Sequence, residues 1–190
     1  MLPLLLGGCG TQISFEKVDY QGHVRIESEG QGYCYHVPKD WEIREALEDS
    51  DVVCMAPDGE NVRDSIVSST VSAAEIGGDP VKFVASQLEE LGSSVTVLQE
   101  WSRSDSAASL ILDDSSFSTQ PLAQFIYLHV RPNGDGVLIA CTTHKDKLEE
   151  RREFFHNIVS KTNYNIEECE GVGGIPKVFP TPEVTFSPAP

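Results

Sequence analysis

The sequence lacks any excess of basic residues. Its 190 residues include 14 lysines and arginines against 30 aspartates and glutamates, which gives a formal net charge of -16. Nucleic acids and anionic membrane surfaces attract proteins through clustered lysine and arginine side chains, so this balance argues against binding either of them through charge. The acidic residues occur in short clusters without the ordered oxygen spacing of a calcium-binding loop. We therefore interpret them as part of a solvated surface.

A transmembrane helix is also missing, since no apolar run approaches the roughly 20 residues that span a bilayer. The apolar stretch that opens the chain, Leu2 to Leu6, is followed by Gly7, Gly8 and Cys9. Secretory signals place an apolar segment before small residues, and they begin with basic residues, which are absent here. The Leu-Gly-Gly-Cys sequence resembles the lipobox of bacterial lipoproteins, in which the cysteine thiol receives a diacylglyceryl group. The resemblance implies that residues 1–8 are a signal-peptide remnant and that Cys9 is a lipidated N-terminus.

Two interpretations of this opening stay open. If Cys9 is lipidated, the chain is an exported bacterial lipoprotein of the outer or cytoplasmic membrane, facing the periplasm, a lumen or the exterior. If it is not, the stretch is a leucine-rich terminus that arose by chance, and the protein is cytoplasmic. Residues 9–31 are mostly polar, with one β-forming stretch at Val24–Ile26, and such a segment is typical of a tether between a lipid and a domain.

The central part of the chain predicts one α+β domain over residues 32–162, with a mainly antiparallel sheet flanked by helices. Runs of β-branched and aromatic residues that end at turn-forming residues indicate its strands. The strongest hairpin signal is the Pro132–Gly136 loop. Strands are expected at 33–37, 51–56, 65–73, 94–101, 107–112, 122–131 and 137–143, with a connection over 39–50 and helices over 79–91 and 145–160.

Helical spacing predicts which residues of the two helices face the core. In the first helix, Asp79 is the expected N-cap and Pro80 suits the first helical position. In the second helix, Phe155 and Ile158 are expected to be buried. The apolar stripe of the first helix consists of Val81, Val84, Leu88 and Leu91.

Several of these features resemble the DcrB-like lipoproteins of bacteria and the PsbP-like extrinsic proteins of photosynthetic membranes, which share an α/β/α sandwich. One shared element is a first strand that ends in Pro-x-x-Trp, here Pro38 to Trp41. The other is a final hairpin whose apolar second strand, Val137 to Thr143, precedes a helix with the paired aromatics Phe154 and Phe155. These motifs belong to a fold and carry no catalytic residues. The resemblance implies a non-enzymatic protein that stabilises an assembly or acts as a chaperone or adaptor.

The cysteines form no Cys-x-x-Cys pair and the histidines are scattered, so no zinc site is predicted. Export permits disulfides, because they persist in oxidising compartments. With Cys9 lipidated, the residues Cys34, Cys54, Cys141 and Cys169 remain, and they allow three sets of pairs. We predict a disulfide between Cys34 and Cys54, because antiparallel pairing of the first two expected strands brings them close. The alternative is that all of these cysteines are reduced.

Phosphate-binding glycine loops, nucleophile elbows and nucleotide-binding fingerprints are absent as well. A thiol nucleophile needs a nearby base, and two pairs have this composition: Cys34 with His36, and Cys141 with His144. Cysteine in a strand is more often a small buried hydrophobic residue. We therefore predict no enzyme, no catalytic residue, no cofactor and no metal, and keep a Cys/His-dependent enzyme as an alternative.

Residues 163–190 change composition, with glycines and then prolines separating isolated apolar residues. Such a segment either has no fixed structure or docks on a partner as an extended arm, and in the second case the contacts come from Ile175, Phe179, Val184 and Phe186. Together these features predict a membrane-anchored lipoprotein that serves as a non-catalytic accessory or scaffold subunit of a membrane-associated protein complex. The main alternative is a cytoplasmic chaperone or adaptor of the same fold.

Overall fold

The computed structural model describes residues 13–14, 23–28, 32–45, 52–57, 64–92, 94–113 and 121–165. All strands and both helices predicted between residues 32 and 162 are present. In chain order the elements are β1 (Ile13–Ser14), β2 (His23–Ser28), β3 (Tyr33–Pro38), β4 (Glu42–Glu45), β5 (Val52–Met55), β6 (Ser65–Val71), α1 (Ala73–Ile76), α2 (Pro80–Leu91), β7 (Val95–Arg103), β8 (Ser106–Asp113), β9 (Leu122–Val130), β10 (Gly136–His144), the short 3-10 helix η1 (Lys145–Lys147) and α3 (Leu148–Ser160).

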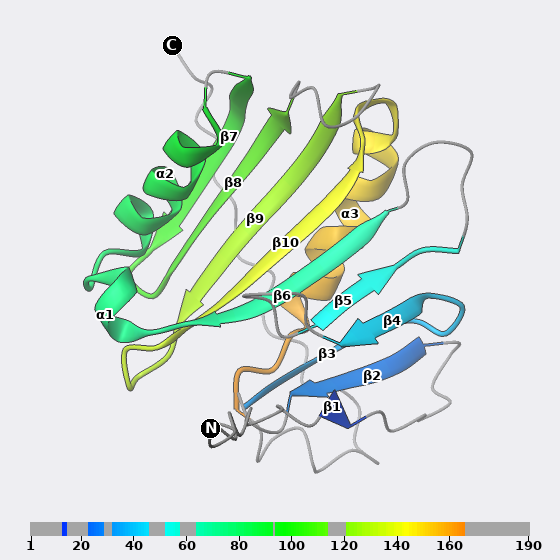
Figure 1. Ribbon diagram of the computed structural model, residues 1–190, viewed down its shortest axis with the longest axis horizontal. Helices are drawn as coiled ribbons and strands as arrows, with labels where there is room; N and C mark the ends of the chain where they lie inside the picture. The colour runs from blue at the N-terminus through cyan, green and yellow to red at the C-terminus, as the bar shows by residue number, and fades with distance from the viewer. Residues whose placement is uncertain are drawn as a thin grey trace, which may run out of the picture.

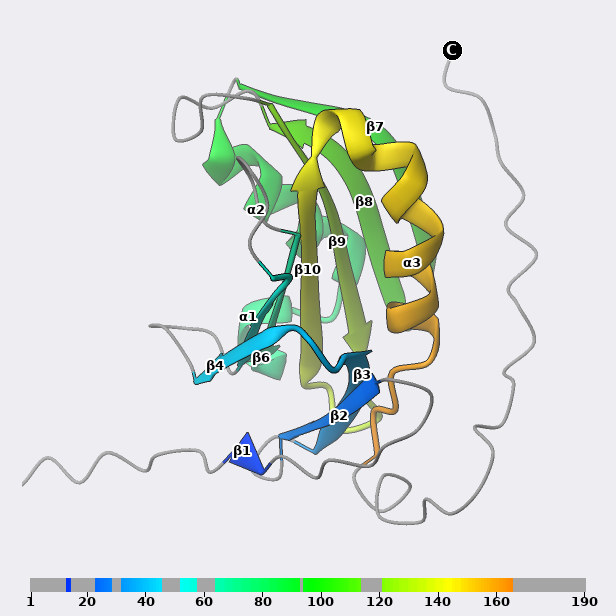
Figure 2. The same cartoon turned by 90° about the vertical axis from the view of Figure 1, so that its right-hand side faces the viewer.

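The strands form two antiparallel sheets. The large sheet has seven strands in the order β4-β5-β6-β10-β9-β8-β7, and the small sheet has the order β1-β2-β3. Helices α1 and α2 lie on one face of the large sheet, and α3 lies on the opposite face (Figures 1 and 2). The prediction of an α+β fold, with a mainly antiparallel sheet flanked by helices, is confirmed.

The β9–β10 hairpin turns at the predicted loop. Gly134 has a φ of 91°, a backbone conformation that residues with a side chain rarely adopt. Asp135, in the same loop, accepts a hydrogen bond of 3.1 Å from the backbone N–H of Ala73. This contact ties the hairpin to the first turn of α1.

The core on the α2 side lies between that helix and strands β7 to β9. Asp79 accepts a hydrogen bond of 3.0 Å from the backbone N–H of Lys82, which confirms its role as the N-cap. Val81 is 47% exposed, so its predicted place in the buried stripe is wrong. The reason is that α2 packs mainly over β8 and β9, which leaves its side toward β7 open. The residues buried in this cluster include Val84, Leu88, Ala107, Ile111, Ile126 and Leu128.

The core on the α3 side joins the two sheets. Tyr33 and Tyr35 of β3 have no exposed surface, and their hydroxyls lie 2.9 Å and 3.1 Å from the hydroxyl of Ser68 on β6. Phe155 and Ile158 of α3 are buried in the same cluster, as predicted. The small sheet is therefore attached to the large sheet through side chains.

Three predictions about the organisation of the chain need correction. β3 was expected in the same sheet as the later strands, but it belongs to the small sheet. β2 lies inside the segment predicted as a tether, and its Ile26 is fully buried, so the folded domain begins before residue 32. The connection predicted over 39–50 contains β4, which pairs with β5.

Candidate functional site

The first predicted cysteine–histidine pair is not arranged for catalysis. Cys34 is disulfide-bonded and 4% exposed, so its sulfur offers no thiolate to His36. The pKa of His36 is lowered by burial and, to a smaller extent, by the charges of Arg25, His23 and Lys161. A sulfur that is already part of a disulfide cannot serve as the nucleophile of a dyad.

The second predicted pair is separated by the sheet itself. Cys141 has no exposed surface, and burial raises the pKa of its thiol far above the usual range. His144 lies three residues further along β10, and residues at this spacing point to opposite faces of a strand. The Nδ1 atom of His144 accepts a hydrogen bond of 3.2 Å from the backbone N–H of Asp146. A buried thiol with a raised pKa is unreactive, so this pair is not organised as a nucleophile and base.

The predicted disulfide between Cys34 and Cys54 is wrong. Cys54 carries a buried free thiol, while Cys34 is bonded to a cysteine outside the described residues. The reason lies in the alternation of β3. Tyr35 points toward the large sheet, where its hydroxyl lies 3.6 Å from the sulfur of Cys54, so the preceding residue, Cys34, points the other way.

Other predicted features fall partly outside the part of the chain that the structure describes. Among the described residues, no group of three or more His, Cys, Asp or Glu side chains is placed to hold a metal ion. Within the same ranges, no helix has the length and apolar character needed to cross a membrane. The roles predicted for the residues outside these ranges stay predictions, and those residues are Cys9, Ile175, Phe179, Val184 and Phe186.

The large exposed apolar side chains of the described residues lie on α2 and on the neighbouring edge strand β7. Val81 of α2 is 47% exposed, and Val97 and Leu98 of β7 are 44% and 42% exposed. β7 is the last strand of the large sheet at this end, beside α2 (Figure 1). We call this region, defined by Val81, Val97, Leu98 and Glu100, the α2–β7 corner. Val81 lies at the start of α2, whereas Val97 and Leu98 lie near the start of β7, next to the end of α2. Exposed apolar side chains along an edge strand are typical of interaction surfaces.

The exposure of β7 follows from its position and from a bulge. The register between β7 and β8 shifts between Val97 and Gln99, so that Leu98 is an extra residue in β7. A bulge bends an edge strand and interrupts the alternation of its side chains. In the described part of the chain, no strand pairs with the outer edge of β7. Main-chain donors and acceptors are therefore exposed beside apolar side chains.

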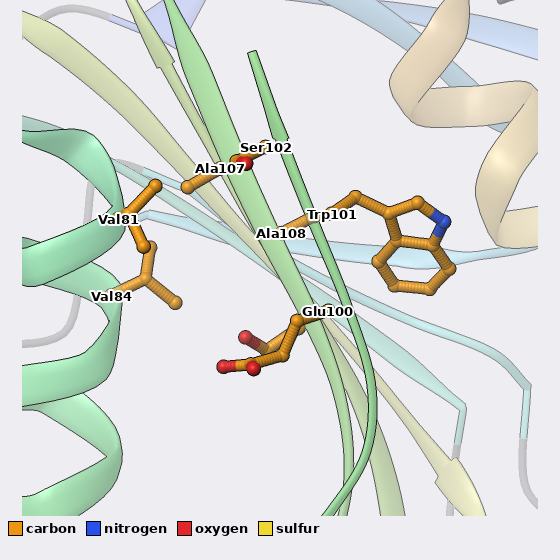
Figure 3. A pocket seen from close by; sticks show the side chains of 8 residues that line it. Val81, Val84, Glu100, Trp101, Ser102, Ala107 and Ala108 are labelled. Carbon is orange, nitrogen blue, oxygen red and sulfur yellow. The ribbon is translucent and has the colours of Figure 1, made fainter. Parts of the chain in front are cut away.

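A pocket of about 160 Å³ lies at this corner, between the start of α2 and the second half of β7 (Figure 3). Val81 and Val84 line it from the helix, and Glu100 and Ser102 line it from the strand. The remaining lining residues include small residues of β8: Ala107, Ala108 and Ser109. The pocket is open because the residues beneath it have short side chains.

Glu100 is the one charged residue among those that line this pocket. Its carboxylate points toward α2, whereas Trp101 points to the other side of the sheet (Figure 3). Within the described ranges, Glu100 takes part in no ion pair or side-chain hydrogen bond. The site therefore combines an apolar wall with one carboxylate that lacks a cationic partner.

The opposite face of β7 is held to the body of the domain. Trp101 packs edge-on against Phe125 with ring centroids 5.5 Å apart, and Phe125 stacks against Tyr127 at 6.4 Å. Arg152 of α3 donates a hydrogen bond to the side-chain oxygen of Gln99. β7 is thus fixed from the α3 side, and no other strand of the described ranges covers its outer edge.

Sequence reasoning misses this site. It places Val81 in the buried stripe of a helix and treats residues 94–101 as one regular strand. The signal that could have found the site is the pair Val97 and Leu98, because two consecutive large apolar residues cannot both face the core of a regularly alternating strand.

Comparison with known proteins supports the fold and gives no family. No known protein family and no curated protein matches the sequence. The Ran-binding protein Mog1p of Saccharomyces cerevisiae is a similar solved structure, with a TM-score of 0.54 and 12% identity over 80% of this chain and 96% of that chain. Cyanobacterial PsbP (CyanoP) of Synechocystis sp. PCC 6803 has a TM-score of 0.53 and 14% identity over 80% of this chain and 97% of that chain.

These likenesses establish a PsbP/Mog1-like fold. They confirm at the level of the fold the resemblance to PsbP-like proteins that the sequence motifs indicated. The resemblance to DcrB-like lipoproteins stays a prediction. At such low identity the likeness shows the fold alone, and a function has to be argued from the site.

Proposed function

We propose that this chain is a non-catalytic binding protein, an accessory subunit of a protein complex, and that the α2–β7 corner is its contact surface. The observation that carries the proposal is the corner itself, where α2 and β7 together present exposed apolar side chains, an open pocket and a strand edge that no other described strand pairs with. Mog1p, which has the same fold, is named as a Ran-binding protein, and the resemblance to PsbP-like extrinsic proteins implies an accessory role.

The state of the cysteines also favours binding over catalysis. The cysteines of both candidate pairs are buried, and one of them is in a disulfide. A Cys/His-dependent enzyme requires an accessible sulfur that is readily converted to thiolate. Neither Cys34 nor Cys141 has this character.

We propose further that the protein works at a membrane, anchored by a diacylglyceryl group on Cys9. Two acyl chains anchor a protein stably, whereas a single chain does so only marginally. The disulfide at Cys34 supports export, because disulfides persist in oxidising compartments and are rare in the cytosol. The net charge of -16 disfavours direct contact with an anionic lipid surface, so the lipid is the element that would hold the protein there.

The C-terminal segment is proposed as a second contact with the partner. Prolines limit the conformations of an extended segment, and isolated apolar side chains between them suit a groove or a sheet edge of another protein. The residues concerned are Ile175, Phe179, Val184 and Phe186.

Two variants in the native host separate anchoring from binding. We expect Cys9→Ser to move the protein to the soluble fraction, because a serine cannot form the lipid thioether. We expect Leu98→Lys to stay in the membrane fraction but to lose proteins that co-purify in mild detergent, because it places a charge in an apolar contact. Asn157→Lys, an exposed site on α3, is the matched control.

Each result has a contrary outcome. Undiminished membrane association of Cys9→Ser would leave the cytoplasmic chaperone or adaptor as the better account. Co-purification that is unchanged in Leu98→Lys, or lost equally in Asn157→Lys, would remove the α2–β7 corner from the contact surface.

A further inference from the structure

We propose that the partner presents an extended segment that adds to β7 as a new edge strand, with an apolar side chain in the pocket and a lysine or arginine against Glu100. This inference rests on the proposed function, because it names the chemistry of the partner for the same surface. Its failure is separable from that of the proposed function, as the experiment below shows.

The main chain of β7 is regular beyond the bulge. After the bulge, residues 99–103 of β7 pair with β8 in unbroken register, from Gln99 opposite Leu110 to Arg103 opposite Ser106. The outer edge of this regular stretch has no strand beside it within the described residues. An extended peptide pairs with such an edge through main-chain hydrogen bonds, and its alternate side chains supply the specificity. The bulge at Leu98 limits the added strand to this stretch.

The space above β7 on the α2 face can hold a side chain of an added strand. Every second side chain of an added strand points toward the α2 face of the sheet. On that face α2 packs mainly over β8 and β9, so the region above β7 stays open and contains the pocket of about 160 Å³ beside Val81 and Val84. A cavity of about 150 Å³ accommodates a benzene-sized group. One apolar side chain of the partner therefore fits against the two valines.

The charge at the pocket favours a cationic side chain on the partner. Glu100 places a carboxylate at the pocket that no described residue pairs with, on a chain with a net charge of -16. A cationic side chain two positions from the apolar one would lie on the same face of the added strand and within reach of this carboxylate. A second copy of the chain is a poorer occupant, because association of two strongly acidic chains is opposed by electrostatic repulsion.

The experiment measures binding of three short capped peptides to the full chain by fluorescence anisotropy. The first peptide alternates threonine and valine, with a lysine in place of one valine. The second peptide has a glutamate at the position of that lysine. The third peptide has the sequence of the first, but its main-chain amides are N-methylated. We expect the lysine peptide to bind and the glutamate peptide to bind roughly fivefold more weakly, the upper range for an exposed charge pair. The N-methylated peptide should not bind, because it cannot donate main-chain hydrogen bonds.

Protein variants locate the contact. Glu100→Lys should reverse the preference between the lysine and glutamate peptides, and Val81→Ser should weaken both because it removes apolar contact. Both side chains are exposed, so neither variant is expected to disturb folding. Glu153→Lys, which makes the same charge change on an exposed residue of α3, is the matched control and should leave the preference unchanged.

Any one of three peptide results would overturn the inference. These are no binding of the lysine peptide at millimolar concentration, binding that N-methylation leaves unchanged, or a charge preference that Glu100→Lys does not alter. Sedimentation that shows a dimer dissociated by Leu98→Lys would make a second copy the occupant, which also overturns it. If the peptides fail while Leu98→Lys still loses its co-purifying proteins, the proposed function stands and only the added strand is rejected.

Discussion

Ser68 connects the two sheets through a single buried hydroxyl. It has no exposed surface, and both Tyr33 and Tyr35 reach it with their hydroxyl groups, at 2.9 Å and 3.1 Å. A hydroxyl taken out of water without a hydrogen-bond partner is costly. The small serine on β6 therefore satisfies two tyrosines of β3 in a position where alternation alone would favour an apolar residue.

We expect Ser68→Ala to lower the free energy of unfolding by about 2–4 kcal/mol, because it removes a partner from two buried hydroxyls. The measurement is urea unfolding followed by circular dichroism. Ser69→Ala, on the neighbouring residue that is only half-buried, should cost much less. A loss of stability in Ser68→Ala no larger than in Ser69→Ala would show that Ser68 does not link the sheets.

The free thiols give a second prediction at the residue scale. Burial raises the pKa of the Cys54 thiol from 9.0 to about 11, and burial likewise raises the pKa of Cys141. Because the folded state holds the Cys54 proton more tightly, the stability that this thiol contributes is fully present below pH 9.0 and is lost as the pH rises through about 11. We expect a thiol reagent at pH 8 to label both cysteines only after denaturation. Rapid labelling of either in the native protein would reopen the enzymatic alternative.

At the scale of elements, one buried carboxylate connects α3 to the sheet in addition to the apolar contacts of the helix. Asp64 is 4% exposed and accepts a hydrogen bond of 2.7 Å from the hydroxyl of Thr143 on β10. Arg151 of α3 places its Nε atom 2.6 Å from the same carboxylate. Asp64, which directly precedes β6, thus connects this strand to β10 and to α3.

We expect Asp64→Ala to lower the free energy of unfolding by about 2–4 kcal/mol, because Thr143 and Arg151 lose a shared buried partner. Glu42→Ala is the control, since Glu42 and Arg44 form a 2.8 Å pair on the surface and such pairs contribute little. Chemical denaturation of both variants checks the contrast. Equal losses would mean that the carboxylate at Asp64 does not secure α3.

The elements predicted from the sequence are those with local signals. The β9–β10 hairpin follows from its loop, and α2 follows from Asp79 and its apolar spacing. α1 was missed although Ser72 and Glu75 form a capping box, because the helix itself has only four residues. β4 was missed because its sequence, Glu-Ile-Arg-Glu, is short and charged.

The assignment of strands to sheets depends on contacts between distant residues, which local patterns do not report. β3 has the composition of a strand, but its membership of the small sheet is decided by β2 and by the contact of its tyrosines with Ser68. The candidate site was missed for the same reason. The openness of the α2–β7 corner depends on where α2 packs across the sheet, and no residue spacing within α2 encodes that position.

At the scale of the whole molecule, the disulfide links the fold to the proposed anchor. Cys34 is disulfide-bonded, and Cys54 and Cys141 have free thiols. Of the five cysteines in the sequence, Cys9 and Cys169 are left as partners for Cys34. A lipidated Cys9 has its sulfur in a thioether and cannot form a disulfide. The lipoprotein account therefore requires that Cys34 be bonded to Cys169.

Mass spectrometry of the native protein, digested without reduction, tests this account most directly. We predict an N-terminal peptide that begins at Cys9 and carries a diacylglyceryl group, together with a cross-linked peptide that joins Cys34 to Cys169. A cross-link between Cys34 and Cys9, or a peptide in which residues before Cys9 are still attached to an unmodified thiol, would contradict the account.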